Sequence, residues 1–412
     1  MDDLRAALGA FDPDAPLDAA PDPWDYLPMP VVRAAPPWAM AEMIAAEPAL
    51  AARIGRGVVA DGSADALAAA LRASAASGGP VVVTGCGTSE HAAIGVAAIL
   101  GDAWRAAGFA GLGPVAAQAF ELAQEPPTGG LVIGISHEGG TAATIAAMDA
   151  ARARGAGIAV ITGSAASPAG VAADVVISTI EMDRSWCHTV GYVSPLAAAS
   201  AVADVLTGAA PQAGALAQRV RAGIDAAWAP GPDGVRPAAA IGRTIGDASH
   251  LLVVASGVDR VTARELVLKV EEAAWVPSAV RDLETFLHGH LPATGASTAL
   301  VLILTTGDAL DARTTRARQA LAAAAATGIV SGAILGEAAS SRIPAHLTPA
   351  GRIVVPDGGP LGSAATSLLG AAGPLQLVTL EVAAARGTNP DPIRRDDPVY
   401  LRAAELADDP EG

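Results

Sequence analysis

The chain has 412 residues, of which 51% are hydrophobic and only 3% aromatic, and its formal net charge is −16. This length exceeds what one ordinary hydrophobic core supports, so two domains are expected. The acidic charge disfavours nucleic acid as a partner, and no run of 18 apolar residues predicts a membrane span. The acidic N-terminus is unlike a signal peptide, and two cysteines make no disulfide framework. We therefore expect a reduced, cytoplasmic protein.

Residues 1–37 form an acidic, proline-rich arm that is not expected to fold alone. Trp24 and Tyr26 are its candidates for packing onto the body of the protein. After the arm, the sequence predicts two short helices over 38–44 and 50–54, separated by a proline-containing turn.

From residue 64 the pattern alternates between helices and short apolar strands, which are predicted over 81–84, 131–135, 157–161 and 174–178. This alternation predicts a parallel sheet covered by helices on both faces. The polar turns Gly-Cys-Gly-Thr-Ser (85–89) and Ser-His-Glu-Gly-Gly-Thr (136–141) follow the first two strands. Ligands of such sheets bind at the carboxyl ends of the strands, where helix N–H groups suit an anion or a polar group. The plainer interpretation of each turn is a tight connection without a ligand.

The second half repeats this pattern after an Ala/Gly/Pro-rich stretch at 208–237. Strands are predicted over 251–255, 299–304, 330–335 and 352–355, and a closing helix over 364–386. The repetition indicates a duplicated α/β unit. We expect one domain over 38–225, a second over 235–386, and a tail over 387–412 that has no core pattern of its own.

Residues 261–276 predict a helix with a charged stripe, because Glu265, Lys269 and Glu272 stand at i, i+4 and i+7. These three side chains project within about 60° of one another. On a mostly apolar helix such a stripe must be paired or must line a cavity. His288 follows in a turn-like segment, and a carboxylate with an imidazole is the usual pair for proton transfer near neutral pH. The plainer alternative is a helix-supporting ion pair and a structural histidine.

Taken in order, these motifs resemble the sugar isomerase (SIS) family, and most of all the tandem-SIS isomerase half of glucosamine-6-phosphate synthases. The likeness covers about residues 40–398 and is carried by the segments 40–48, 85–89, 136–141, 263–272, 288–289, 374–377 and 387–391. It implies an α/β fold of two tandem SIS domains, each a parallel sheet flanked by helices on both faces in a flavodoxin-like three-layer sandwich. We expect no glutaminase domain in this chain.

The resemblance also implies roles for individual residues. Glu272 matches the base that moves a proton between C1 and C2 through an enediol or enolamine, and Glu265 and Lys269 match the residues that support it. His288 matches a ring-opening histidine that is delivered to the neighbouring subunit. The implied substrate-binding residues are Gly87, Thr88, Ser89, Ser136, His137, Glu138, Thr141, His188, Thr189 and Arg394. The resemblance implies a small sugar as substrate, no metal or organic cofactor, no membrane or nucleic-acid partner, and a homodimer with shared sites under the C-terminal tail.

The chain departs from the family at three places. Pro398 stands where the synthases carry an imine-forming lysine, and His188, Thr189 and Val190 replace a Ser-Thr-Lys segment. His137 and Glu138 replace Gln and Ser in the phosphate loop.

An ionised Glu138 would repel a phosphate, whereas an outward or helix-capping Glu138 would leave phosphate binding intact. We therefore expect an aldose–ketose isomerase or amino-sugar deaminase whose substrate lacks a phosphate in the usual pocket, and no glutamine-dependent amidotransferase activity. The alternative is a non-catalytic SIS protein that binds a carbohydrate derivative and regulates a partner.

Overall fold

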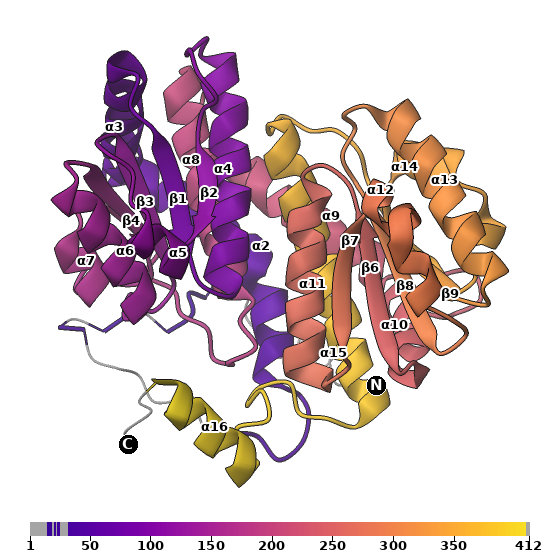
Figure 1. Ribbon diagram of the computed structural model, residues 1–412. Coiled ribbons are helices and arrows are strands. Elements are labelled where there is room, and N and C mark those ends of the chain that lie inside the picture. The colour runs from indigo at the N-terminus through magenta and orange to yellow at the C-terminus, as the bar shows by residue number, and fades with distance from the viewer. Residues whose placement is uncertain (1–14, 19, 22, 25–31, 409–412) are drawn as a thin grey trace.

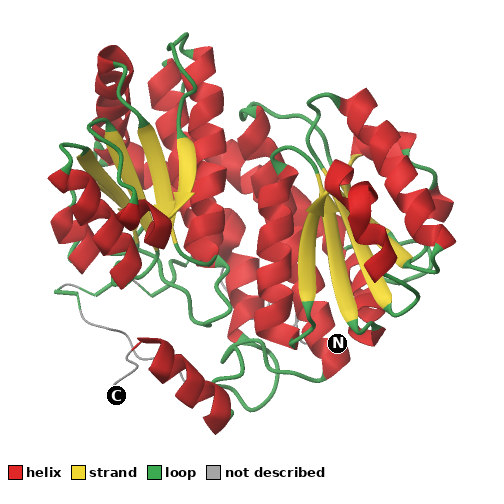
Figure 2. Cartoon of the chain, in the orientation of Figure 1, coloured by secondary structure: helices red, strands yellow, loops and turns green. Residues whose placement is uncertain are grey.

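The protein, described from a computed structural model over residues 15–18, 20–21, 23–24 and 32–408, is an α/β structure with two five-stranded sheets (Figure 1). Every strand pair is parallel, and the strand orders are β2-β1-β3-β4-β5 and β7-β6-β8-β9-β10. Helices cover both faces of each sheet (Figure 2). The predicted fold class is confirmed, and the identical strand order fits the predicted duplication.

The first unit is built around apolar inner strands that are buried on both faces. Its strands are β1 (Val81–Gly85), β2 (Val115–Gln118), β3 (Leu131–Ser136), β4 (Gly157–Thr162) and β5 (Val175–Ser178). Its helices are α3 (Ser63–Ser77), α4 (Thr88–Ala106), α5 (Ala119–Gln124), α6 (Ala142–Ala153), α7 (Pro168–Ala172) and α8 (Val190–Thr207).

The second unit repeats the arrangement. Its strands are β6 (His250–Ala255), β7 (Ser278–Asp282), β8 (Thr298–Leu304), β9 (Val330–Gly336) and β10 (Arg352–Val355). Its helices are α9 (Ala213–Trp228), α10 (Pro237–Asp247), α11 (Asp259–Ala274), α12 (Leu283–Thr285), α13 (Leu310–Ala326), α14 (Glu337–Arg342) and α15 (Ser363–Arg386), and α16 (Pro398–Asp408) follows in the tail.

Two strands were missed by the sequence analysis, and both lie at the edge of a sheet. β2 is half exposed, so it lacks the continuous apolar run of the inner strands. β7 begins only four residues after α11 ends, within a segment rich in charged residues. Edge strands need fewer apolar side chains than central ones, which is why the pattern did not reveal them.

The predicted helices 38–44 and 50–54 are in fact one helix, α2 (Ala39–Ala60), which continues through Pro48. Its first turn is held by the tail, because the Asp391 carboxylate accepts hydrogen bonds from the N–H groups of Ala39 (2.8 Å) and Met40 (3.0 Å). Next to Pro48, the buried Glu47 accepts a hydrogen bond from Gln376 of α15 at 2.7 Å. Tertiary contacts therefore override the helix-breaking tendency of the proline.

Helices α4 and α11 pack side by side in opposite directions. Thr88 at the start of α4 contacts Glu265, whereas Gly95, further along α4, lies against Val261, nearer the start of α11. Each helix begins at the carboxyl end of the first strand of its own sheet. The last turn of α11 is therefore carried to the carboxyl edge of the first sheet.

A large apolar core, formed largely by α2, α4, α8, α9, α11 and α15, lies between the two sheets. Two of these helices, α8 and α15, are long and apolar enough to cross a membrane by length and composition alone. Their most apolar windows are 78% buried inside the structure, however, which is the environment of core helices in a globular protein.

Candidate active site

The two polar turns of the first unit meet at the carboxyl edge of its sheet, as predicted. β1 leads through Gly87, which has a φ of +57°, into the first turn of α4 at Thr88. β3 ends at Ser136, whose side chain lies 3.4 Å from that of Thr141. Between them Gly139 has a φ of +77°, and a Cβ there would lie 2.0 Å from Ser167 Oγ. Only glycine fits this position, so the turn has one close-packed shape.

The charged stripe of α11 is buried against this edge. Lys269, the only lysine of the chain, is fully buried, and its Nζ lies 2.6 Å from Glu272 Oε2 and 3.7 Å from Glu265 Oε1. Glu265 also accepts a hydrogen bond from Thr88 Oγ1 at 3.3 Å, and the Nδ1 of His91 lies 2.7 Å from Glu265 Oε2. The stripe is therefore a connected polar network, and Thr88 of the first unit belongs to it.

The two carboxylates that share Lys269 have pKa values shifted in opposite directions. Burial raises the pKa of Glu272, and the opposing effect of Lys269 does not cancel it. Burial acts the same way on Glu265, but Lys269, His91 and Thr88 outweigh it, so the pKa of Glu265 is lowered. The two carboxylates likewise outweigh burial at Lys269 and raise the pKa of its ammonium group. These shifts favour the ionised forms of Glu265 and Lys269 and disfavour the ionised form of Glu272.

His137 and His188 form a second polar cluster next to the turn after β3. The Nε2 of His137 accepts a hydrogen bond from the N–H of Asp183 at 2.9 Å, so neutral His137 carries its proton on Nδ1. The ring of His188 packs edge-on against that of His137, with 5.4 Å between centroids, and burial lowers the pKa of His188 to about 4. His188 is therefore neutral at physiological pH and presents a polar, uncharged side chain.

Glu138 lies in the same turn, and burial raises the pKa of its carboxyl group, while His137 opposes that shift. Its backbone carbonyl accepts a hydrogen bond from the Trp24 indole at 2.9 Å. Trp24 thus packs onto the body as proposed, whereas Tyr26 lies outside the described residues.

Two predicted substrate-binding residues have their polar groups engaged by other residues of the protein. Thr189 is fully buried, and its N–H and hydroxyl donate to Asp183 Oδ1 at 2.9 and 3.5 Å. The guanidinium of Arg394 is stacked between the rings of Trp275 and Tyr400, 4.4 and 3.8 Å from their centroids. Arg394 therefore anchors the tail and α16 beside the last turn of α11.

His288 and Glu272 are not brought together within one chain. The segment after β7 packs Phe286 against Leu252 and Val254, on the face of the second sheet opposite to α11. The His288 side chain is 69% exposed, and its Nε2 lies 2.6 Å from Glu284. A single chain thus supplies the carboxylate network without the histidine.

The sequence analysis missed His91, Asp183 and Cys187. His91 stands three residues after Thr88 on the same helix, a spacing that could have placed both on one face. Cys187 is buried beside Glu272 and Lys269. Asp183 accepts hydrogen bonds from the first N–H groups of α8, at Val190 (3.0 Å) and Gly191 (2.7 Å).

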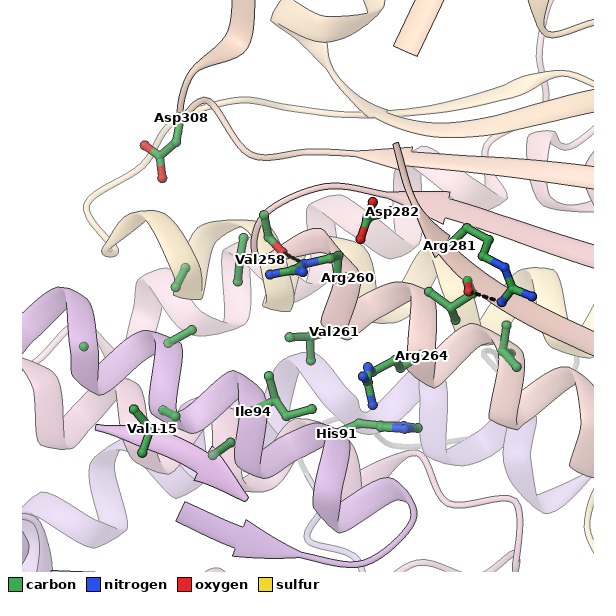
Figure 3. Close-up of a pocket in the computed structure, with 18 of the residues that line it drawn as sticks. His91, Ile94, Val115, Val258, Arg260, Val261, Arg264, Arg281, Asp282 and Asp308 are labelled. Atoms are coloured by element: carbon green, nitrogen blue, oxygen red, sulfur yellow. Dashed lines mark hydrogen bonds between the residues drawn. The ribbon is translucent and has the colours of Figure 1, made fainter. Parts of the chain in front are cut away.

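An open groove of about 1260 Å³ lies on the other side of α4 and α11 (Figure 3). It is bordered by the edge strands β2 and β7, and Figure 3 shows His91 and Arg264 next to each other on its wall. Of the site residues, His91 alone lines this groove, and none of the predicted substrate-binding residues does. The groove therefore approaches the carboxylate network from outside.

Comparison with known proteins agrees with this fold. Residues 76–207 match the SIS domain family. Since the second half repeats the same sheet, the chain has two tandem SIS-like domains. The search of curated protein sequences gives no match.

Solved structures with the same fold extend over both units. The chain is similar to the C-terminal domain of glucosamine-fructose-6-phosphate aminotransferase from Francisella tularensis, with 17% identity, 88% of this chain and 99% of that chain covered, and a TM-score of 0.71. It is similar to tagatose-6-phosphate ketose/aldose isomerase from Escherichia coli, with 16% identity, 90% of this chain and 98% of that chain covered, and a TM-score of 0.67. A third similar structure is glucosamine-6-phosphate deaminase from Thermotoga maritima, with 16% identity, 76% of this chain and 88% of that chain covered, and a TM-score of 0.55. At these identities the likeness establishes the fold.

Proposed function

We propose that this protein is a sugar or amino-sugar isomerase or deaminase of the tandem-SIS type. The observation that carries the proposal is the pair Glu265 and Glu272, whose pKa values are shifted in opposite directions around one buried lysine. Two carboxyl groups held at different pKa values are the arrangement with which enzymes separate a fixed charge from a proton carrier. The isomerases and the deaminase of the same fold support this class of chemistry.

In the proposed reaction Glu272 takes the proton from C2 of the open-chain sugar, while the C1 carbonyl oxygen takes a proton from solvent and becomes a hydroxyl. Glu272 then returns its proton to C1 of the resulting enediol, or enolamine for an amino sugar, while the C2 hydroxyl or amine releases a proton to solvent and becomes the new C=O or C=N group. Lys269 stays protonated between the carboxylates and offsets the negative charge that Glu272 carries before it takes the proton. Hydrolysis of the C2 imine would complete a deamination.

Lys269 does not serve as an imine-forming nucleophile in this proposal. Its raised pKa keeps the amine protonated, and it is fully buried. Because it is the only lysine, borohydride added during incubation with a ketose substrate should leave the chain without a covalent sugar adduct. A reduced adduct on Lys269, detected by intact-protein mass spectrometry, would contradict this assignment.

The substrate is proposed to lack a phosphate at the turn after β3. Glu138 is partly buried in this turn, and its carboxylate form would repel a phosphate bound there. Two such charges about 4 Å apart repel by several kcal/mol at an effective dielectric near 20. The hydroxyls of Ser136, Thr141 and Thr88, together with His188, suit sugar hydroxyl groups.

The active unit is proposed to be a homodimer that shares its sites. The groove between the edge strands β2 and β7 is flanked by exposed apolar side chains at Leu112, Val115 and Phe120, which a second copy would cover. His290 lines the groove, and the exposed His288 stands two residues away. Docking at this face would allow His288 to complete the partner's site.

The dimer proposal is tested by mixing two inactive variants, Glu272→Gln and His288→Ala. A hybrid dimer contains one site with both residues intact, so an equimolar mixture should recover about a quarter of wild-type activity. No recovery, in a mixture shown by native mass spectrometry to contain hybrids, would contradict shared sites.

The rival function is a sugar sensor that binds its ligand without chemistry. The intact carboxylate network favours the enzyme, because a sensor has no need of a proton carrier beside its ligand. The two functions are separated by incubating the protein with free and phosphorylated hexoses and hexosamines in deuterium oxide. An isomerase incorporates deuterium at C1 or C2 of its substrate; binding without incorporation, seen as a thermal shift with an unlabelled sugar, would identify a sensor.

A further inference from the structure

The described part of the N-terminal arm crosses three consecutive loops at the ligand edge of the first sheet. Ala20 donates its N–H to the carbonyl of Ile180 after β5 at 2.8 Å, and the carbonyl of Pro21 accepts from Ser164 after β4 at 3.3 Å. Trp24 then reaches the turn after β3, where it donates to Glu138. The arm is anchored upstream by Leu17, whose buried N–H donates to Glu181 at 3.2 Å. The order of these contacts follows the order β5-β4-β3 in the sheet.

At the turn after β3 the arm completes a set of three backbone contacts. The carbonyl of His137 accepts from the N–H of Gly163 at 2.8 Å, and that of Gly139 accepts from Ala169 at 2.9 Å. The carbonyl between them, that of Glu138, is held by Trp24. Two of these three donors belong to the α/β unit itself, and the third comes from the arm.

These contacts orient the N–H groups of the turn. In a planar trans peptide the N–H points away from the preceding carbonyl, so holding the carbonyls of 137, 138 and 139 turns the N–H groups of 138, 139 and 140 to the opposite side. In the second unit, the first two N–H groups after β8, which correspond to those of His137 and Glu138, bind a carboxylate. There, the carboxylate of Asp259 accepts from the N–H groups of Thr305 (2.8 Å) and Thr306 (3.1 Å).

We propose that Trp24 is a positioning residue for the substrate, which fixes the peptide between Glu138 and Gly139 so that the Gly139 N–H faces a sugar oxygen. The indole holds this peptide in two ways. Its N–H binds the Glu138 carbonyl, and its ring edge covers Gly140, where an added Cβ would lie 3.3 Å from Trp24 Cζ2. A side chain other than hydrogen at position 140 would crowd this contact. The inference rests on the proposed sugar site and adds the arm to it.

The first test needs no substrate. Amide hydrogen exchange across 136–141 is compared in the wild type, Trp24→Phe, which keeps a ring without the N–H, and Trp24→Ala. Loss of the single hydrogen bond should speed exchange in this turn about fivefold in Trp24→Phe, and more in Trp24→Ala. Trp228→Phe is the matched control, because Trp228 lies on α9 and stacks on Arg236. Exchange in 136–141 that matches this control in both Trp24 variants would overturn the proposal.

The second test uses the sugar that incorporates deuterium with the wild type. Both Trp24 variants should raise KM about tenfold and leave kcat within about twofold, because Glu272 and its network are untouched. An equal fall in kcat with KM unchanged would overturn the positioning role. If no sugar is turned over, the proposed function fails, whereas the exchange experiment still decides whether the arm fixes the turn.

Discussion

The carboxyl edges of the two sheets are built alike and used differently. In both units the second residue after the first strand is a glycine with positive φ, Gly87 at +57° and Gly257 at +63°. Two residues further on, the first unit has Ser89 and the second has Asp259. Asp259 is fully buried and accepts hydrogen bonds from the backbone and hydroxyl of Thr305 and from the backbone of Thr306. The second edge is thus closed by the protein's own carboxylate.

The first edge has no such internal ligand, because among the described residues no side-chain carboxylate accepts from the backbone of the turn after β3. Instead, the antiparallel packing of α4 and α11 carries Glu265, Lys269 and Glu272 from the second unit to this edge. In the proposed function, one unit therefore provides the binding turns and the other provides the proton chemistry. At the second edge, Asp259 occupies the backbone N–H groups that follow the central strand β8.

The largest expected effect follows from removing the proton carrier of the first edge. Glu272→Gln keeps the shape and the hydrogen bond to Lys269 but cannot accept a proton, so turnover should fall by roughly 10² to 10⁴. Unchanged circular dichroism and thermal unfolding would show that the fold is intact. Activity close to wild type would move the role to another group, with Glu265 the first to test.

Ser89→Asp should convert the first edge into a copy of the second. A carboxylate at this position is placed to accept from the N–H groups of His137 and Glu138, as Asp259 does from Thr305 and Thr306. Isothermal titration with the substrate sugar should show binding weakened by roughly 10²-fold, because the new carboxylate competes for the same donors. Ser89→Asn is the neutral control. Equal sugar affinities of the aspartate and asparagine variants would contradict the proposed equivalence of the two edges.

Asp259→Ala should open the second edge and lower stability without altering chemistry. Removal of a buried acceptor leaves two N–H groups and one hydroxyl unpaired, which costs roughly 2 to 3 kcal/mol of unfolding free energy. The free energy of unfolding is measured by chemical denaturation. Asp225→Ala is the control, because it removes only an exposed ion pair on α9 and should change the free energy of unfolding by close to zero. A variant as stable as the wild type would show that Asp259 does not hold this edge.

Glu138→Ser is expected to have the smallest effect and to sharpen the account of the first edge. Without the carboxylate, the preference for a phosphorylated over a free sugar should rise by at least about tenfold, or 1.4 kcal/mol. Competition binding with the two forms of the same sugar measures this ratio. A wild type that already prefers the phosphate tenfold would refute the proposed role of Glu138.

Much of the fold was predictable because its information is local. Buried parallel strands are short apolar runs, and the stripe of Glu265, Lys269 and Glu272 repeats at helical spacing, so both can be recognised within a few residues. The edge strands β2 and β7 carry no such run. Helix α2 continues through Pro48 with the help of contacts to Asp391 and Gln376, which lie more than 300 residues away in the sequence.

The site was only partly predictable for the same reason. The stripe and the polar turns were identified, but their meeting depends on the antiparallel packing of α4 and α11, which no local pattern encodes. Trp24 and Asp183 act on a turn that is distant in the sequence. The separation of His288 from Glu272 follows from β7, one of the two edge strands that the sequence did not reveal.

The most direct test of the account is the pH dependence of deuterium incorporation from solvent into the substrate by the wild type and Glu272→Gln. Glu272 accepts a proton only when ionised, and burial raises its pKa, so the rate should fall as the pH drops through a value above that of an ordinary glutamate, roughly 4.3. Glu272→Gln should bind the same sugar, incorporate deuterium more slowly at every pH, and lose the fall in rate at low pH. A wild-type limb at or below the ordinary value, or an unchanged profile in the variant, would contradict the assignment of Glu272 as the proton carrier.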